Sequence, residues 1–370
     1  MEKMMKVLQI GMSFNPGGIE SFVMTYYRQM KKEGVQFDFI SMFPHLAYEE
    51  EILAMGGRVF HTVDARRHPL AFRRELLKIL TEESYDAVHV NMLSAANIVP
   101  LITAKAANIP VIAAHSHNSS TPGFARNVLH RINKGLIPRY ANTYFACSEV
   151  AGQWLFSERI LKGNHFHLIH NALDMSRFLF QERVRGEMRE KLGVEGKFVL
   201  GHVGRFEEQK NHLFLIEVFK EVAAAEETAV LLLIGEGELE GQVRQKVDEY
   251  NLQERVKFLG IRRDVNKLWM AMDVFVFPSL FEGLPIVALE AQASGIPSVL
   301  SDSITAEVKL TDRVEFISLE AAKETWRDVI LSHKNESRSE EDNGLIRRQF
   351  REAGYDIEQE AQTLLSCYHL

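Results

Sequence analysis

Short apolar runs alternate along this chain with longer segments whose apolar residues recur at helical spacing. Seven runs in the first half predict buried strands, at residues 7–10, 37–41, 58–62, 87–90, 111–114, 143–146 and 166–169. Six more follow in the second half, at residues 198–203, 229–234, 256–259, 274–277, 298–301 and 315–317. Strands that alternate with helices are typical of βαβ units around a parallel sheet. The pattern therefore predicts an α/β protein with two doubly wound, Rossmann-like domains.

Chain length and a change of pattern indicate where the two domains divide. The chain has 370 residues, more than twice the length of a domain of about 150 residues. A charged helical stretch at 181–192 separates the two series of strands. We therefore predict an N-terminal domain at 1–178 and a second domain at 179–346. A polar, acid-rich stretch at 335–343 predicts a loop, and a helical segment follows from Arg347 onward.

Composition excludes several classes of protein. Hydrophobic residues make up 46% of the chain and charged residues 25%, which are averages for a globular protein and not for a disordered or fibrous one. No apolar run approaches the ~20 residues of a membrane-spanning helix, and the start lacks the apolar core of a signal peptide. We therefore expect a cytoplasmic protein. Cys147 and Cys367 are far apart, so neither a disulfide framework nor a zinc site is expected.

Charge is unevenly distributed although the net charge is only −7. No Asp or Glu occurs from Ala87 to Ser148, whereas the segment 105–139 contains five basic residues: Lys105, Arg126, Arg131, Lys134 and Arg139. Within it, residues 124–137 predict an amphipathic helix with a basic polar side. Such a helix suits an anionic membrane surface or a phosphorylated acceptor. A solvated basic face with no partner is the alternative.

Polar residues follow two strands of the predicted N-terminal domain. Gly17 and Gly18 come after the first strand and before a helix, where glycines let a backbone approach an anion. A tight turn would explain them equally well. The fifth strand is followed by His115, Ser116, His117 and Asn118. Either imidazole could form a hydrogen bond with a substrate hydroxyl, and a structural role for each is the alternative.

The second domain carries charged residues in two loops. Gly204, Arg205 and Lys210 follow its first strand, where the two cations could bind a diphosphate or merely be solvated. Pro285 is suited to the first position of a helix that Gly295 ends. Glu282 would then precede that helix. Glu290 would lie within it among apolar residues, where a carboxylate needs a partner such as the vicinal hydroxyls of a sugar.

Taken in order, these residues resemble the retaining glycosyltransferases of family 4, which have the GT-B fold of two domains that face each other across a cleft. The resemblance covers nearly the whole chain. The motifs that carry it are Gly17-Gly18, His115-Ser-His117-Asn118, Asn171-Ala-Leu-Asp174, Gly204-Arg205 with Lys210, Gly235-Glu236-Gly237, Phe258-Leu259-Gly260, and the pair Glu282 and Glu290. The histidine motif together with Ser301-Asp302 is similar to members that make capsules and exopolysaccharides.

The resemblance implies a role for each motif. Arg205 and Lys210 would hold the diphosphate of a nucleotide sugar without a metal, and no cofactor is implied. Glu290 would hold the ribose. The remaining donor-binding residues would be Gly17, Gly18 and Gly204 near the phosphates, Gly260 and Ile261 at the base, and Glu282, Gly283, Leu284, Pro285 and Ile286 at the sugar or its phosphate. His115 would contact the donor sugar, with His117 as its rival.

The acceptor side is expected near His117, Asn118 and Asn91, although relatives often have a second histidine in place of Asn91. By the same resemblance, the helix at about 347–370 would pack back on the N-terminal, acceptor-side domain. The reaction would transfer a sugar, with retention, to a lipid-linked saccharide at the inner membrane face. UDP is the expected nucleotide, and hexose and N-acetylhexosamine stay open.

Two other functions are consistent with the same residues. A GT-B sugar-nucleotide epimerase would use the same site without an acceptor, and a non-catalytic subunit would bind a nucleotide sugar only. A nicotinamide dehydrogenase is disfavoured because no GxGxxG motif follows either domain's first strand. Binding of nucleic acid is not expected, since the chain is acidic overall and lacks interleaved aromatic residues.

Overall fold

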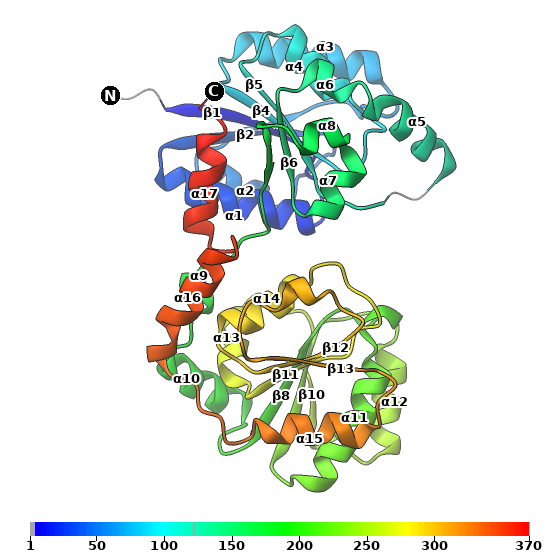
Figure 1. The fold of residues 1–370 in the computed structure, drawn as a ribbon, viewed down its shortest axis with the longest axis vertical. Coiled ribbons are helices and arrows are strands. Elements are labelled where there is room, and N and C mark those ends of the chain that lie inside the picture. The colour runs from blue at the N-terminus through cyan, green and yellow to red at the C-terminus, as the bar shows by residue number, and fades with distance from the viewer. Residues whose placement is uncertain (1–3, 121–122, 370) are drawn as a thin grey trace. The chain divides into compact units, whose positions relative to one another are not determined.

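The computed structural model describes residues 4–120 and 123–369, which form two compact units (Figure 1). The first unit comprises Met1–Leu173 and Gly354–Leu370, and the second comprises Asp174–Ala353. The division after Leu173 lies slightly before residue 178, the predicted boundary. The chain therefore enters the second unit once and returns to the first.

The first unit is a parallel sheet with strand order β3-β2-β1-β4-β5-β6-β7. Its strands are β1 (Met5–Ile10), β2 (Val35–Ser41), β3 (Val59–His61), β4 (Ala87–Met92), β5 (Val111–Ser116), β6 (Thr143–Ala146) and β7 (Phe166–Leu168). Its helices are α1 (Gly18–Lys32), α2 (Glu49–Ala54), α3 (Pro69–Glu82), α4 (Val99–Ala106), α5 (Phe124–Lys134), α6 (Ile137–Tyr140), α7 (Glu149–Leu155), α8 (Glu158–Leu161) and α17 (Ile357–Ser366). The order reverses between β1 and β4, as in doubly wound folds.

Alternate residues of the central strand enter two different hydrophobic cores. Val7 of β1 belongs to a core with Phe22 of α1, whereas the next residue, Leu8, belongs to a second core with Leu76 of α3. Successive strand residues point to opposite faces, so both faces of this sheet are covered. Helix α17 joins the first of these cores through Leu364 and lies beside α1 (Figure 1).

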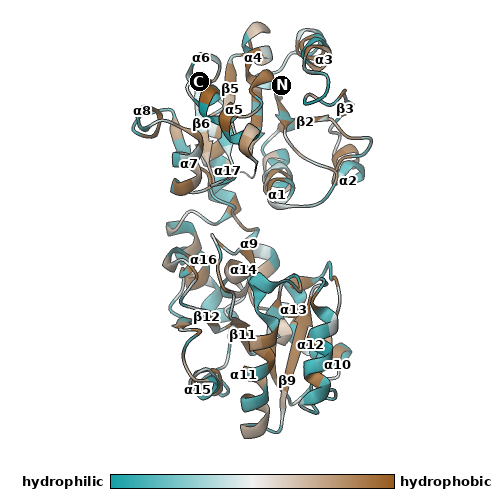
Figure 2. Cartoon of the chain, turned by 90° about the vertical axis from the view of Figure 1, so that its right-hand side faces the viewer, coloured by the Kyte–Doolittle hydropathy of each residue, from teal (hydrophilic) through white to brown (hydrophobic). Residues whose placement is uncertain are grey.

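The second unit is a parallel sheet with strand order β10-β9-β8-β11-β12-β13. Its strands are β8 (Phe198–Val203), β9 (Ala229–Ile234), β10 (Val256–Phe258), β11 (Val274–Phe277), β12 (Ser298–Ser301) and β13 (Val314–Ile317). Its helices are α9 (Met175–Phe178), α10 (Glu182–Leu192), α11 (His212–Ala225), α12 (Glu240–Glu249), α13 (Val265–Ala271), α14 (Ile286–Ala293), α15 (Lys323–Ser332) and α16 (Asn343–Glu352), with 3-10 turns η1 (Glu208–Lys210), η2 (Ala306–Val308) and η3 (Glu340–Asp342). Figure 2 shows the apolar strands β9 and β11 inside and the hydrophilic helix α12 outside.

All predicted strands occur in the described residues, with ends that differ from the predicted ones by at most two residues. Three corrections concern β5 and two helices. Strand β5 continues to Ser116, so His115 lies in the strand and not after it. Pro285 is the N-cap of α14, and Ile286 is the first helical residue. Helix α16 begins at Asn343, inside the predicted loop, and the Asn343 side chain bonds to both the N–H and the C=O of Phe180.

Candidate active site

Three glycine loops form one backbone surface at the carboxyl edge of the second sheet. The N–H of Gly235 donates to the carbonyl of Gly260 (3.0 Å), and the N–H of Gly204 donates to the carbonyl of Ile234 (2.9 Å). Gly235 has φ +135°, and a Cβ there would lie 2.1 Å from the carbonyl oxygen of Gly204. Only glycine permits this approach. Ligands of doubly wound sheets bind beyond this edge.

Lys210 and Glu282 meet at this edge although 72 positions separate them. Lys210 Nζ lies 2.5 Å from Glu282 Oε1 and 4.8 Å from the ring centroid of Phe277. The two side chains are only 16% and 10% exposed, so water screens this ion pair less than it screens a surface pair. An ammonium has three hydrogens, which leaves Lys210 donors for a further anion.

Arg205 has a different setting from Lys210. Its guanidinium lies 2.8 Å from the carboxylate of Glu207, and its side chain is 74% exposed. The cations predicted to act together thus each have their own carboxylate partner. Arg205 keeps the solvent exposure of an ordinary surface arginine, whereas Lys210 is held in a shielded position.

The loop before α14 combines an open backbone with a helix start. Pro285 caps α14 without a side-chain hydrogen bond, so the first N–H groups of this helix have no side-chain partner among the described residues. A Cβ at Gly283 would meet nothing within 4 Å, so packing does not require this glycine. Leu284 and Ile286 are partly buried and Pro285 is buried. On the neighbouring loop, Ile261 is 73% exposed beside Gly260.

Glu290 lies within α14 with one observed donor. Trp269 Nε1 donates to its Oε2 at 3.3 Å. Burial raises the pKa of Glu290 to about 7, although the Trp269 N–H and the charge of Arg177 act in the opposite direction. The sequence predicted that this carboxylate needs a partner, and an indole N–H is a weaker one than a cation. Glu290 is therefore a carboxylate that can accept further hydrogen bonds and that titrates near neutral pH.

His115 and His117 form one cluster in the first unit. Their ring centroids lie 3.9 Å apart, and His115 is fully buried. Burial, followed by the neighbouring histidines, holds the pKa of His115 well below its ordinary value, and burial lowers that of His117 to about 3. Both rings are thus neutral at pH 7 and can act as hydrogen-bonding groups but not as cations.

The two asparagines predicted near the acceptor have separate environments. Asn91 Oδ1 lies 2.8 Å from His117 Nε2, so Asn91 belongs to the histidine cluster. Asn118 Nδ2 donates instead to the carbonyl of Ser120 and shapes its own loop.

Gly17 and Gly18 lie at the start of α1. Gly17 is the N-cap, and a Cβ there would lie 2.9 Å from Glu20 Oε2. A Cβ at Gly18 would meet nothing within 4 Å.

Helix α5 exposes more apolar surface than its sequence predicted. Phe124 is 86% exposed and Ile132 is 62% exposed, and Val128 and Leu129 are also exposed. Lys134, by contrast, is not a free surface cation, because its Nζ donates to the carbonyls of Gln153 and Trp154. Exposed apolar side chains next to exposed arginines are typical of a helix that lies in a membrane interface.

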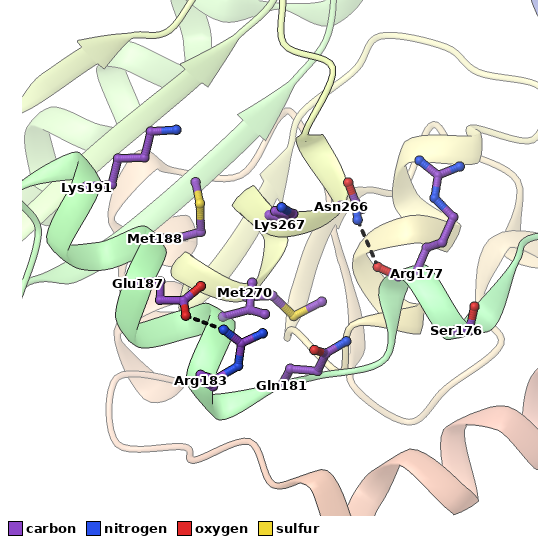
Figure 3. Close-up of a pocket in the computed structure, with 11 residues that line it drawn as sticks. Ser176, Arg177, Gln181, Arg183, Glu187, Met188, Lys191, Asn266, Lys267 and Met270 are labelled. Carbon is purple, nitrogen blue, oxygen red and sulfur yellow. Dashed lines mark hydrogen bonds and ion pairs between the residues drawn. The ribbon is translucent and has the colours of Figure 1, made fainter.

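A pocket of about 440 Å³ opens beside α9, α10 and α13 (Figure 3). Arg177, Arg183, Lys191 and Lys267 contribute to its lining, and Arg183 pairs with Glu187. None of the residues predicted for the site lines this pocket. In the part of the chain that the structure describes, no three His, Cys, Asp or Glu side chains form a group able to hold a metal, and no helix is long and apolar enough to cross a bilayer.

Sequence reasoning missed three side chains that contact the predicted residues, and a fourth that contacts one of these three. Trp269 contacts Glu290, Gln9 contacts Asn91, and His89 contacts His115, while Tyr368 contacts His89. His89 gave a local signal, because it interrupts the apolar run at 87–90. Trp269 and Tyr368 gave none, since Trp269 lies in a different helix from Glu290 and Tyr368 lies 279 positions from His89.

Comparisons with known proteins agree over both units. Residues 16–177 match the family model Glycosyltransferase Family 4, and residues 197–325 match Glycosyl transferases group 1. The chain is 34% identical over 375 residues to a protein from Bacillus subtilis (strain 168) that carries the name glycosyltransferase EpsF, which covers 99% of this chain and 96% of EpsF.

Two further comparisons concern named ligands. An Escherichia coli protein named UDP-Gal:alpha-D-GlcNAc-diphosphoundecaprenol alpha-1,3-galactosyltransferase is 30% identical over 235 residues, which covers 61% of this chain and 60% of that protein. The crystal structure of Anabaena HepE in complex with UDP is similar with a TM-score of 0.76 and 20% identity, over 98% of this chain and 99% of HepE.

Proposed function

Because this chain belongs to glycosyltransferase family 4, we propose that it transfers a sugar from a UDP-linked donor to a lipid-linked saccharide in the synthesis of a surface polysaccharide. The family and the GT-B fold class, with two Rossmann-like units, were predicted from the sequence and are confirmed. The name of the Escherichia coli relative supports a UDP donor and a diphosphoundecaprenol acceptor. The HepE complex supports UDP as the nucleotide.

The observation that carries this proposal is the shielded pair of Lys210 and Glu282 at the edge of the second sheet. In our proposal the free hydrogens of Lys210 bind the diphosphate, and Arg205 turns from Glu207 to the same group. The uncapped start of α14 adds N–H donors for a phosphate. Glu290 accepts hydrogen bonds from the ribose hydroxyls, while Gly260 and Ile261 contact the base.

The reaction would depend on stabilisation of charge on the departing diphosphate. Lys210 and Arg205 supply positive charge, so the proposed enzyme needs no metal. The acceptor hydroxyl attacks on the face that the leaving group vacates, and a diphosphate oxygen takes the proton of that hydroxyl. The configuration at the anomeric carbon is thereby retained. His115 binds the donor sugar close to this carbon.

Calorimetric titration of the full chain with UDP, GDP and ADP, each with and without EDTA, tests the proposal. Micromolar binding of UDP that EDTA does not change is expected. No binding of any nucleotide would contradict the proposal and favour the non-catalytic subunit. A UDP-sugar screen with NMR of the product then tests retention. Conversion of the donor sugar without transfer would instead indicate an epimerase.

We further propose that α5 holds the enzyme at an anionic membrane surface, where a lipid-linked acceptor is available. Exposed Phe124 and Ile132 would enter the interface, while Arg126 and Arg131 would meet anionic headgroups. The double variant Phe124→Ser/Ile132→Ser and the single variant Arg131→Glu test this. Each should weaken binding to vesicles that contain anionic phospholipid, by roughly tenfold for the charge reversal. Leu70→Ser, on the exposed side of α3, is the control, and equal losses in all variants would contradict the proposal.

A further inference from the structure

A chain of hydrogen bonds runs through the interior of the first unit and ends at His115. It links the side chains of Tyr368, His89 and His115 in that order. These three side chains are between 0% and 2% exposed, so water does not compete for their hydrogens. Tyr368 follows α17, whereas His115 lies in β5, so these hydrogen bonds connect segments that are remote in sequence.

The direction of both bonds follows from the Tyr368 hydroxyl, whose hydrogen-bond partner among the described residues is His89 Nδ1. Beside these bonds, the Asn91 amide has its own fixed orientation. A carbonyl oxygen only accepts, so Asn91 directs Nδ2 to the Ile10 carbonyl (3.3 Å) and to Gln9 Oε1 (3.0 Å).

The same direction continues through the two histidines. The Tyr368 hydroxyl lies 2.5 Å from His89 Nδ1 and donates to it, because a buried O–H without an acceptor is unfavourable. His89 then carries its hydrogen on Nε2 and donates to His115 Nδ1 at 3.0 Å. His115 Nδ1 is thus an acceptor, and in a neutral ring the hydrogen must lie on Nε2. That Nε2 is buried and has no partner among the described residues.

His117 receives the opposite polarity from Asn91. Asn91 Oδ1 accepts from His117 Nε2 at 2.8 Å, which leaves His117 Nδ1 without a hydrogen. The two rings lie close together at an angle yet offer different groups, a donor on His115 and a lone pair on His117. They are therefore not interchangeable as ligands of a sugar.

We infer that Tyr368 and His89 are positioning residues that fix His115 as its Nε2–H tautomer, so that His115 presents a hydrogen-bond donor to an oxygen of the bound donor sugar. The inference rests on the proposed function only for the identity of this oxygen. Burial lowers the pKa of His89 to about 3 and that of His115 well below its ordinary value, which keeps both rings neutral. Only a neutral imidazole has two tautomers, and the hydrogen bonds select one of them.

Nitrogen NMR of the full chain with ¹⁵N-labelled histidine measures the tautomer directly at pH 7.5. The His115 signals are assigned by their loss in His115→Gln. We expect a protonated Nε2 and an unprotonated Nδ1 in the natural chain. In Tyr368→Phe, His89 loses the donor that sets its direction, so His115 should populate both tautomers. A His115 Nε2 that stays fully protonated in Tyr368→Phe, or that is unprotonated in the natural chain, would overturn the inference.

Tyr26→Phe is the matched control. Tyr26 is buried in the same unit and donates its hydroxyl to the His170 carbonyl at 2.8 Å, outside the chain of bonds. This variant loses a comparable buried hydrogen bond, and the tautomer of His115 should not change. If it changes as much as in Tyr368→Phe, general loosening of the unit explains the effect and the inference fails.

A second pair of variants keeps the test valid if Tyr368→Phe does not fold. His89→Gln offers an oxygen to Tyr368 and an N–H to His115, so it should preserve the tautomer, whereas His89→Leu should not. Transfer by His89→Leu should fall about three- to tenfold, as for one lost hydrogen bond, with UDP affinity unchanged and His89→Gln close to the natural chain. A changed tautomer with unchanged transfer supports the positioning role and contradicts only the contact between His115 and the sugar.

Discussion

At the carboxyl edge of the second sheet the functional groups are charged, whereas at the same edge of the first sheet they are neutral. Lys210, Glu282 and Glu290 lie at the edge of the second sheet. The histidines and Asn91 lie at the edge of the first sheet. Both sheets are doubly wound, so topology gives each the same location for a site. The degree of burial then decides the chemistry. Full burial removes the charge of His115, whereas Lys210 is partly exposed and lies beside a carboxylate.

The difference matches two tasks in transfer from a nucleotide sugar. A diphosphate needs positive charge, which in our proposal the second unit supplies from a loop and a helix start. A sugar hydroxyl needs a donor or acceptor with a fixed direction, which neutral buried side chains supply. Substitutions at the two sites should therefore differ in how much they reduce activity or UDP affinity, and in how that loss depends on pH.

The largest effect is expected from loss of the cations. Arg205→Ala with Lys210→Ala should reduce kcat by at least about a hundredfold, because removal of one preorganised stabilising group typically costs about 10²–10³ in rate. Initial rates of UDP release in the presence of acceptor measure this. Arg244→Ala with Lys246→Ala is the control, since both residues also pair with glutamates but lie on α12. A double variant at 205 and 210 that is as active as the control would refute the diphosphate assignment.

An intermediate effect is expected at Glu290. Glu290→Gln should weaken UDP binding roughly tenfold or more at pH 8, as for a hydrogen bond to a charged group. In the natural chain UDP affinity should fall as pH drops through about 7, where this carboxylate takes up a proton. Calorimetry at pH 6 and pH 8 measures both. UDP itself also titrates, but it does so equally with both proteins. If UDP affinity depends on pH equally in the natural chain and in Glu290→Gln, Glu290 is excluded from the site.

The free energy of unfolding should change with pH in the direction opposite to UDP affinity. The pKa of Glu290 is raised from 4.5 to about 7, so between these values the folded chain binds more protons than the unfolded chain. The free energy of unfolding contributed by this residue therefore rises as pH falls from 7 toward 4.5 and decreases as pH increases. Glu290→Gln should raise Tm at pH 8 and lack this dependence, which thermal unfolding at pH 5.5 and pH 8 measures.

The smallest effect is expected at the neutral site. His115→Phe should reduce kcat/KM about three- to tenfold, the range for one neutral hydrogen bond. The factor should be the same at pH 6 and pH 8, because His115 is uncharged at both values. His117→Phe separates the two rival residues, and a larger loss in His117→Phe would assign the sugar contact to His117 instead. A factor that grows toward low pH would contradict the neutral state of the cluster.

Strand positions were predictable because each buried strand is a short apolar run with polar flanks. Strand β5 was predicted to be too short for the same reason, since His115 and Ser116 are polar although they are fully buried in the sheet. Glu282 and Lys210 were chosen as candidate site residues from their loops. Their direct contact was not, because it joins residues 72 positions apart.

The remaining features depend on contacts that no local pattern encodes. Trp269 donates to Glu290 from another helix, and Tyr368 reaches His89 from a segment 279 positions away. The exposure of the apolar side of α5 needs the structure, because an amphipathic pattern does not show whether another element covers that side. The polarity of the two histidines likewise needs the bonds from Tyr368 and Asn91.

The return of the chain to its first unit also affects the order in which the protein can fold during synthesis. Domains generally fold as units while the ribosome adds residues from the N-terminus. Here Ile357, Ala361 and Leu364 of α17 complete the core around Val7 and Phe22, yet they are made after the entire second unit. The second unit can therefore close its core on the ribosome while the first still lacks a helix. The half of the enzyme that is translated first reaches its native state last.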